Sequence, residues 1–162
     1  MITKFCSTLL LLALFSFPVI SQTATPPVET TLYFRALQAA LEENVKAYSK
    51  LNIRRDHRDV IVERNIHINN DFPLQIQSFK IQYLDLPGLI SKYKKEKKEY
   101  PIIVMSPIRN EGEKLSVSLT DYWISFKKNS LTYSMEGGAK VIFRFDCDHR
   151  EYVVDKVELW GV

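Results

Sequence analysis

The sequence predicts an α+β fold in which one long N-terminal helix packs on a curved antiparallel β-meander. Apolar residues recur at helical spacing along the segment 31–50. From residue 100 onward, apolar runs of strand length alternate with short polar turns. In two of these runs the apolar positions change parity, which is typical of a β-bulge or a sharp bend.

The helical segment carries a stripe of apolar residues on one side and polar residues on the other. The stripe consists of Leu37, Leu41, Val45 and Tyr48, with Ala40 alongside. Thr30 or Thr31 is in position to cap the first turn. We expect the stripe to cover one face of a sheet, and a helix that binds a partner is the alternative.

The middle of the chain predicts two strands and a short helix. The segment 59–64 is a short strand after a basic connection, and 73–85 is a second strand. The segment 86–98 is a short helix or turn that ends in a lysine-rich tip. Five lysines form this tip, with two glutamates between and beside them: Lys92, Lys94, Lys95, Lys97 and Lys98 with Glu96 and Glu99. A solvated helix end explains them, and contact with an anionic surface such as lipid headgroups is the alternative.

The last third of the chain predicts five strands. They cover 100–108, 114–126, 131–135, 139–145 and 151–160. The first is a continuous apolar run, as in a strand buried on both faces. The pair Gly137-Gly138 is interpreted as a hairpin turn between the third and fourth strands.

Two of these strands change their apolar face along their length. The second changes at Thr120–Asp121 and the fifth at Asp155–Lys156. A bulge at each place would curve the sheet around the helix and create a concave surface. The alternative is that both faces of the sheet are partly covered there, with no bulge.

This order of elements resembles the cystatin-like and nuclear transport factor 2-like superfold, in which a long helix precedes a bent antiparallel sheet. The resemblance rests on element order alone. Members of that superfold include pocket enzymes, ligand binders and protease inhibitors, so that the resemblance implies a fold and does not select a function.

The N-terminus predicts export. Lys4 is followed by an apolar run over 5–20, which is typical of a secretory signal peptide at 1–21 with cleavage before Gln22 or after Ala24. An uncleaved N-terminal anchor is the alternative. A flexible leader at 22–29 and one domain at 30–162 would remain, roughly 140 residues in all. We therefore expect a secreted or periplasmic protein that does not span the membrane after cleavage.

Composition narrows the range of partners. The chain is 46% hydrophobic and 25% charged with a net charge of +3, an ordinary globular balance that is too weakly basic to indicate a nucleic acid partner. Cleavage would leave Cys147 as the only cysteine, which favours a buried, inert thiol over an intermolecular disulfide.

The stretch 146–151 (DCDHRE) concentrates ionisable side chains in six positions. It fits neither a calcium loop nor a four-ligand zinc site, because Arg150 stands at the fifth loop position and no second cysteine follows. A turn explains it best: Asp148 and His149 make the bend, while Phe145 and Cys147 share the core-facing parity of Val141 and Phe143. A metal or a reactive thiol is the alternative, and we assign no metal and no cofactor.

Catalytic candidates are few. No nucleophile elbow, zinc-protease, P-loop or dinucleotide motif occurs. A pocket enzyme would have to combine His57 or His149 with Asp121 or Asp155. A solvated loop explains His57, and His67 has no evident partner.

Aromatic side chains are the better binding candidates. We select Tyr122, Trp123, Tyr133 and Trp160 as residues that line a pocket or a contact surface, although core packing explains most aromatic residues of a sheet. The sequence therefore predicts an exported, non-catalytic module that binds an unknown small ligand or protein. A pocket enzyme with an acid–histidine pair and a secreted hydrolase inhibitor are the alternatives.

Overall fold

The computed structural model of the protein describes residues 28–50, 59–66, 68, 72–127 and 130–161. The predicted signal peptide, most of the leader, His57 and His67 lie outside these residues. The helices are α1 (Val28–Lys50) and α2 (Leu86–Glu96). The strands are β1 (Asp59–Glu63), β2 (Gln75–Ile76), β3 (Phe79–Leu84), β4 (Tyr100–Met105), β5 (Arg109–Glu111), β6 (Lys114–Lys127), β7 (Ser130–Asp146) and β8 (Glu151–Trp160).

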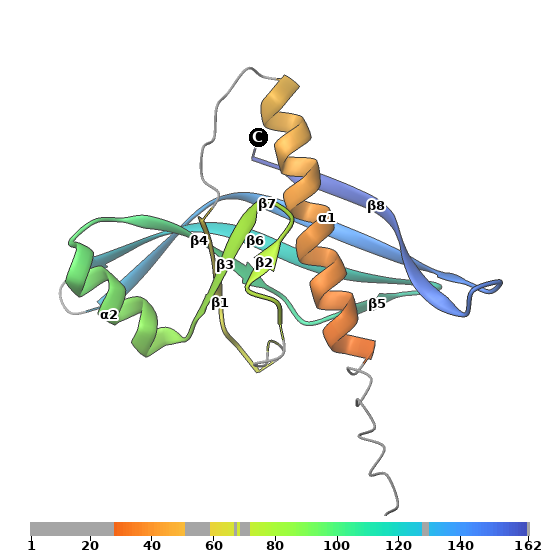
Figure 1. Ribbon diagram of the computed structural model, residues 1–162, viewed down its shortest axis with the longest axis horizontal. Coiled ribbons are helices and arrows are strands. Elements are labelled where there is room, and N and C mark those ends of the chain that lie inside the picture. The colour runs from red at the N-terminus through yellow and green to blue at the C-terminus, as the bar shows by residue number, and fades with distance from the viewer. Residues whose placement is uncertain (1–27, 51–58, 67, 69–71, 128–129, 162) are drawn as a thin grey trace, which may run out of the picture.

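Helix α1 crosses one face of the sheet and contacts β6, β7 and β8 (Figure 1). Its buried side chains follow helical spacing: Leu32, Tyr33, Ala36, Leu37, Ala40 and Leu41. The predicted helix is confirmed, but its last turns project beyond the sheet, so that Val45 is 49% exposed. Because the helix begins at Val28, Thr30 and Thr31 lie inside it and the predicted cap at these residues is wrong.

The strands form one mixed sheet in the order β2-β3-β1-β4-β6-β7-β8, with β5 paired to β6. The pairs from β4 to β8 are antiparallel, whereas β1 runs parallel to both β3 and β4. Helix α2 connects β3 to β4, since two strands that point the same way need a crossover. The α+β class is therefore correct, but the sheet is mostly, not wholly, antiparallel.

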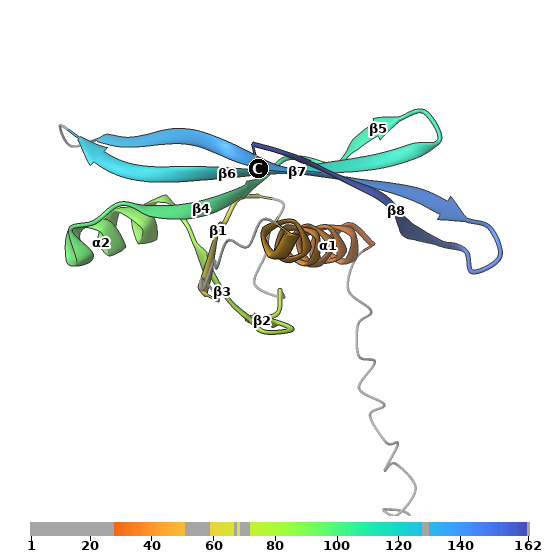
Figure 2. The same cartoon turned by 90° about the horizontal axis from the view of Figure 1, so that it is seen from above.

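Two hydrophobic cores lie on opposite faces of this sheet. The larger packs against α1, and the smaller packs against α2 and contains Leu89, Tyr100, Ile102 and Ile124. Ile102 and its neighbour Ile103 are both buried but belong to different cores, because adjacent residues of a strand point to opposite faces. Figure 2 shows α1 and α2 on the two sides of the wall made by β1 and β3. The prediction that β4 is buried on both faces is confirmed.

Bulges occur in two neighbouring strands. In β8 the register against β7 shifts so that Asp155 is the extra residue, at the place where the sequence predicts a bulge. In β6 the ladder with β4 is regular, and the extra residue is Glu136 on the partner strand β7. The change of apolar face in β6 therefore marks the passage from the α1 core to the α2 core.

Strand β7 is one continuous strand where two were predicted. The pair Gly137-Gly138 lies inside it, next to the bulge at Glu136. A Cβ atom at Gly137 would lie 2.6 Å from the carbonyl oxygen of Trp160, and one at Gly138 would lie 2.5 Å from the Cζ2 atom of the Trp160 ring. The glycines thus permit a close approach of β8, and the predicted hairpin turn at this pair is wrong.

The segment 73–85, predicted as one strand, is a tight hairpin. Strands β2 and β3 pair antiparallel across a turn in which Gln77 has a φ of 51°. The predicted short helix after it is confirmed as α2. Asp85 caps this helix, since its carboxylate accepts a hydrogen bond of 2.9 Å from the backbone N–H of Gly88.

Candidate functional site

Two of the predicted binding residues, Tyr122 and Tyr133, lie together on the face of the sheet that α2 partly covers. Their rings meet edge to face with centroids 5.7 Å apart. The Tyr133 hydroxyl also points to a carboxylate oxygen of Glu63 at 3.4 Å. Tyr133 lies in β7 and Glu63 in β1, and β4 and β6 lie between these two strands in the sheet. Met135 pairs with Tyr122 across the ladder and is 63% exposed. We call Glu63, Tyr122, Tyr133 and Met135 the tyrosine–glutamate surface.

Glu63 is the unusual member of this surface. It is half-buried, and burial raises the pKa of its carboxyl above the ordinary value, against a smaller lowering by the Tyr133 hydroxyl. The contact of 3.4 Å is long compared with the ~2.7 Å typical of a hydroxyl hydrogen bond. Within the described part of the chain, Glu63 has no ion pair with a lysine or arginine. Its charge is therefore poorly compensated.

The other carboxylates with shifted pKa values behave in the opposite way. Lys140 holds the pKa of Glu111 below its ordinary value, and Lys92 does the same for Glu96. Hydrogen bonds from Lys114 and Lys156 lower the pKa values of Asp155 and Glu158. Among the residues that the structure describes, Glu63 thus differs from these groups in having no lysine or arginine that would stabilise its charged form.

Two tyrosines on the α2 side of the sheet are partly desolvated, as Glu63 is. Burial, with the nearby charge of Glu63 as a second cause, raises the pKa of Tyr133 to about 12. Burial likewise raises the pKa of Tyr100 to about 12, and the Tyr100 hydroxyl donates a hydrogen bond of 2.6 Å to the carbonyl of Leu89 in α2. Both phenols therefore stay protonated at neutral pH and act as hydrogen-bond donors.

The two predicted tryptophans lie elsewhere on the sheet. Trp123 is half-buried on β6, between Pro101 of β4 and Ser134 of β7 in the ladder. Trp160 is 36% exposed near the end of β8, with its ring over Gly138. Of the four predicted aromatic residues, the structure thus brings Tyr122 and Tyr133 into one cluster.

The stretch 146–151 contains a turn between β7 and β8, as predicted. One carboxylate oxygen of Asp146 accepts hydrogen bonds from the backbone N–H groups of Asp148 and His149, and the other lies 3.1 Å from Nδ1 of His149. The hydrogen bond from the His149 side chain is the main cause that lowers the pKa of Asp146.

The predicted burial around this turn is wrong. Cys147 is a free, exposed thiol, and Phe145 is 45% exposed although Val141 and Phe143 of the same parity are fully buried. The hairpin of β7 and β8 extends past α1 (Figure 1). Side chains on the helix-facing side of the strands are therefore not covered by the helix there. Among the described residues, no group of three or more His, Cys, Asp or Glu side chains is placed to hold a metal ion.

The candidate acid and histidine residues have separate partners. His149 interacts with Asp146, whereas Asp155 forms ion pairs with Lys114 at 2.7 Å and Arg144 at 3.8 Å. Asp121 is half-buried on β6 and pairs with Gly137 of β7, directly beside the bulge at Glu136. The contacts of His149 lie within one turn, and those of Asp155 connect β8 to β6 and β7.

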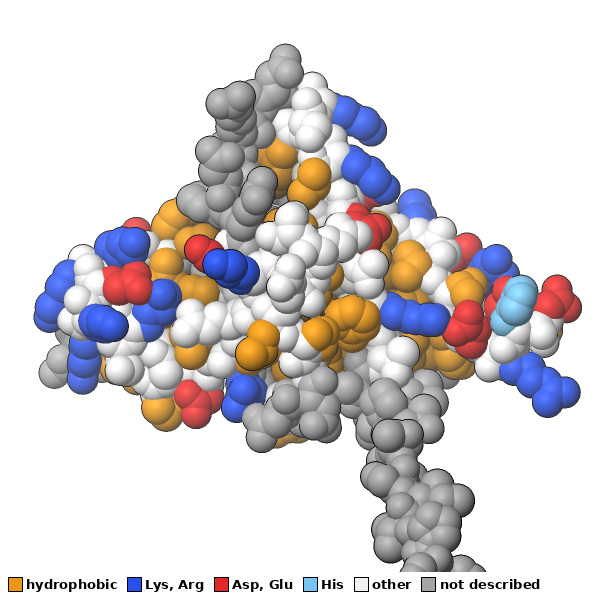
Figure 3. Space-filling view, viewed as in Figure 1, with side chains coloured by type: hydrophobic (Ala, Val, Ile, Leu, Met, Phe, Trp, Pro, Cys, Tyr) orange, Lys and Arg blue, Asp and Glu red, His pale blue; other side chains and the backbone are white. Residues whose placement is uncertain are grey.

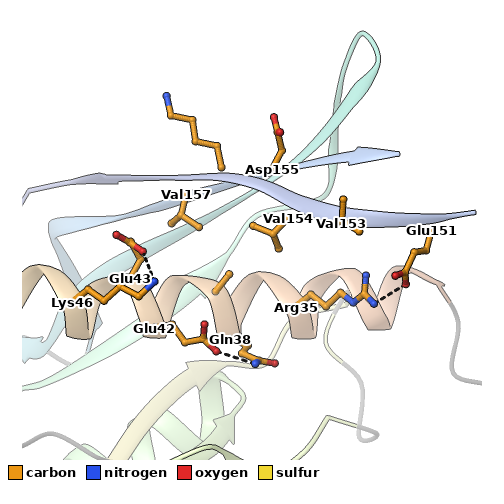
Figure 4. Close-up of a pocket in the computed structure, with 12 residues that line it drawn as sticks. Arg35, Gln38, Glu42, Glu43, Lys46, Glu151, Val153, Val154, Asp155 and Val157 are labelled. Carbon is orange, nitrogen blue, oxygen red and sulfur yellow. Dashed lines mark hydrogen bonds and ion pairs between the residues drawn. The ribbon is translucent and has the colours of Figure 1, made fainter. Parts of the chain in front are cut away.

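An open groove of about 650 Å³ runs between α1 and β8 (Figure 4). Val154 and Val157 point from β8 toward the helix, whereas Asp155, the bulge residue, points away. The charged and polar groups along the groove pair with each other: Arg35 with Glu151 at 2.8 Å, Gln38 with Glu42 at 2.9 Å, and Lys46 with Glu43 at 3.1 Å. The Arg35 guanidinium also donates to the carbonyl of Tyr152. These side chains of the groove thus bond to one another, and the contacts of Arg35 hold α1 and β8 together.

No family model, no curated protein and no solved structure matches this chain. Neither helix in the described ranges combines the length and the apolar character that a membrane crossing requires.

Glu63 is the residue that the sequence does not reveal. It stands in the strand 59–63 as an ordinary polar position, and its desolvation comes from its packing in the folded sheet. A glutamate directly after the apolar residues Val60, Ile61 and Val62 is the one sequence signal that would have placed it near buried surface.

Proposed function

We propose that this protein is a non-catalytic binding module whose tyrosine–glutamate surface receives an arginine or lysine side chain of a partner protein. The observation that supports this proposal is the half-buried Glu63 carboxylate, whose partner in the described structure is a long contact to a phenol. A cation placed there would balance the charge of the carboxylate and replace the stabilisation by water that burial has removed.

The neighbouring side chains suit such a cation. The rings of Tyr122 and Tyr133 provide faces for a cation–π contact, which contributes about 0.5–2 kcal/mol depending on desolvation. Exposed Met135 offers an adaptable apolar surface for the aliphatic part of the side chain. An arginine fits better than a lysine, because its planar guanidinium can stack on a ring and bond a carboxylate at the same time.

The test is a titration with N-acetyl-arginine amide, followed through the ring resonances of Tyr122 and Tyr133 by NMR. N-acetyl-citrulline amide is the matched control ligand, since it keeps the shape of arginine and lacks the charge. We expect saturable shifts with the arginine derivative at roughly millimolar concentrations. The citrulline derivative should produce none.

Two variants make the test specific. Glu63→Gln should abolish the shifts, whereas Glu113→Gln, which removes an exposed carboxylate in the turn between β5 and β6, should leave them unchanged. Equal shifts with both derivatives, or binding that persists in Glu63→Gln, would refute the proposal. Binding of the amino-acid derivative with no response to longer arginine-containing peptides would indicate a small cationic ligand and would count against a protein partner.

We further propose that the module acts outside the cytoplasm as a secreted or periplasmic protein. The support is the charged start and apolar run of residues 1–21, followed by small residues at a cleavage position. The mass of the protein recovered from its natural host tests this proposal. A chain beginning at Gln22 or Thr25 supports it, and a chain that retains Met1 contradicts it.

The finer fold assignment, a cystatin-like or nuclear transport factor 2-like topology, also belongs to this proposal. A long helix against a bent antiparallel sheet supports it, as do the bulges at Glu136 and Asp155. The parallel pairs of β1 with β3 and β4 depart from a simple meander. An experimental structure in which these parallel ladders persist would assign the chain to a different topology.

A further inference from the structure

The lysine-rich end of α2 forms a surface that the proposed binding site does not use. We call Lys92, Lys94, Lys95, Lys97 and Lys98 the basic tip. Helix α2 lies at one end of the longest axis of the molecule, and blue side chains gather on that end in the space-filling view (Figures 1 and 3). Glu63 pairs in the sheet with Leu84, just before the opposite end of α2, about 16 Å away along an 11-residue helix.

The basic tip accounts for the net charge of the whole chain. The chain has 22 basic and 19 acidic residues, a net charge of +3. The segment 92–99 has five lysines and two glutamates, which is also +3. The remaining residues are therefore balanced, 17 against 17, and the charge imbalance of the molecule is concentrated at one end.

The helix dipole and the ion pairs within α2 do not account for the excess of lysines at its end. A helix C-terminus carries about half a negative charge, which a single lysine in the last turn would neutralise. Glu96 pairs with Lys92 at 2.5 Å and with Lys98 at 3.6 Å. Lys95 and Lys97 are exposed and, within the described residues, have no ion pair. At least two lysines of the tip thus face solvent with uncompensated charge.

Aromatic rings lie directly beside these charges. The Lys94 ammonium lies 5.9 Å from the centroid of Phe126, and the Tyr93 ring packs 5.7 Å from the same ring. Phe126 is half-buried near the end of β6, just before the connection to β7. A protruding end that combines lysines with partly exposed aromatic rings suits the interface between water and lipid headgroups.

We propose that the basic tip binds the surface of an anionic lipid bilayer. The flat, phosphate-bearing surface complements a protruding, positively charged end, and each lysine near such a surface strengthens binding about fivefold. The attraction acts within about a Debye length of the membrane and weakens as salt is added. It requires no insertion of the chain and leaves the tyrosine–glutamate surface free for a protein partner.

The test is flotation of the full chain with vesicles of phosphatidylcholine alone and with vesicles that also contain phosphatidylglycerol. The difference between the two isolates the electrostatic term, because any contribution of the apolar run 5–20 is common to both. We expect binding to the anionic vesicles to exceed binding to the neutral ones and to fall as sodium chloride is raised.

Paired variants locate the contact. Lys95→Gln with Lys97→Gln should weaken binding to the anionic vesicles about 25-fold, the product of two losses of about fivefold each. Lys46→Gln with Lys50→Gln removes the same charge from the far end of α1 and should change binding less than twofold. Unchanged melting temperatures would show that both variants remain folded.

Any of three outcomes of the vesicle experiment would overturn the proposal. They are equal binding to neutral and anionic vesicles, equal losses in the two double variants, and no binding to anionic vesicles at low salt. Binding of the basic tip to an acidic protein in place of the vesicles would likewise refute a lipid partner.

Discussion

Gly138 provides the most direct test of the fold around the candidate residues. An added Cβ atom would overlap the carbonyl oxygen of Leu119 on β6 and would lie 2.5 Å from Cζ2 of Trp160 on β8. The Trp160 ring could move, but the strand backbone could not move without breaking the β6–β7 ladder. Overpacking typically costs about 1–3 kcal/mol, and a clash with backbone belongs at the upper end of that range.

For Gly138→Ala we therefore expect a loss of about 3 kcal/mol in the free energy of unfolding, which lowers the melting temperature by about 10 °C in a domain of this size. Gly112→Ala is the matched control. Gly112 has a φ of 76° and no atom within 4 Å of an added Cβ, so that its substitution costs only about 1 kcal/mol of backbone strain, or about 3 °C. Thermal unfolding followed by circular dichroism measures both, and equal losses would refute the packing argument.

Three further predictions concern the candidate site and its surroundings. Glu63→Gln should raise the melting temperature at neutral pH and have no effect well below pH 4. Because burial raises the pKa of Glu63, the folded state binds more protons than the unfolded state at pH values between the two pKa values. The wild-type protein therefore loses stability as the pH rises through that window, and the glutamine variant does not. A variant that melts lower at neutral pH would contradict this sign. Asp85→Ala should cost about 1 kcal/mol, measured by urea denaturation, because it removes the cap of α2, whereas Asp85→Asn should cost much less. Cys147 should react with a thiol reagent in the folded protein nearly as fast as in urea, since it is exposed; protection in the folded state would contradict its position in the turn.

Local patterns predicted the elements whose cause lies within their own segment. Helix α1 follows from its apolar spacing, and the turn at Asp146 follows from the ability of aspartate to bond its own backbone. The bulge at Asp155 follows from a change of apolar parity, because β8 packs against α1 on one face along its length.

The features that the sequence did not predict depend on partners far along the chain. The parallel position of β1 between β3 and β4 leaves no pattern in the residues of β1 itself. Gly137 and Gly138 have the composition of a hairpin turn, and only the approach of Trp160 shows that they belong to a strand interior. The predicted burial of Phe145 was also wrong. The alternation of residues along a strand predicts which face of the sheet a side chain lies on, but it does not show how far the helix that covers that face extends.

The candidate site shows the same division. Tyr122 and Tyr133 were selected because large aromatic side chains on a sheet line contact surfaces, and they meet in the structure. Trp123 and Trp160 satisfied the same criterion and lie apart from them. Glu63 escaped selection because its raised pKa results from desolvation in the folded state, and the apolar residues before it in β1 do not by themselves show that its carboxyl is desolvated.

The bulge at Asp155 also affects how copies of this chain behave in a crowded solution. Strand β8 ends the sheet, and an outer strand of ten residues is a template on which another chain can extend the ladder. The extra residue interrupts the regular spacing of backbone donors and acceptors near the middle of that template, and Asp155, Lys156 and Glu158 place alternating charges there. Open-ended growth into fibres thus meets a mismatch after a few residues, so the same irregularity that curves the sheet limits its polymerisation.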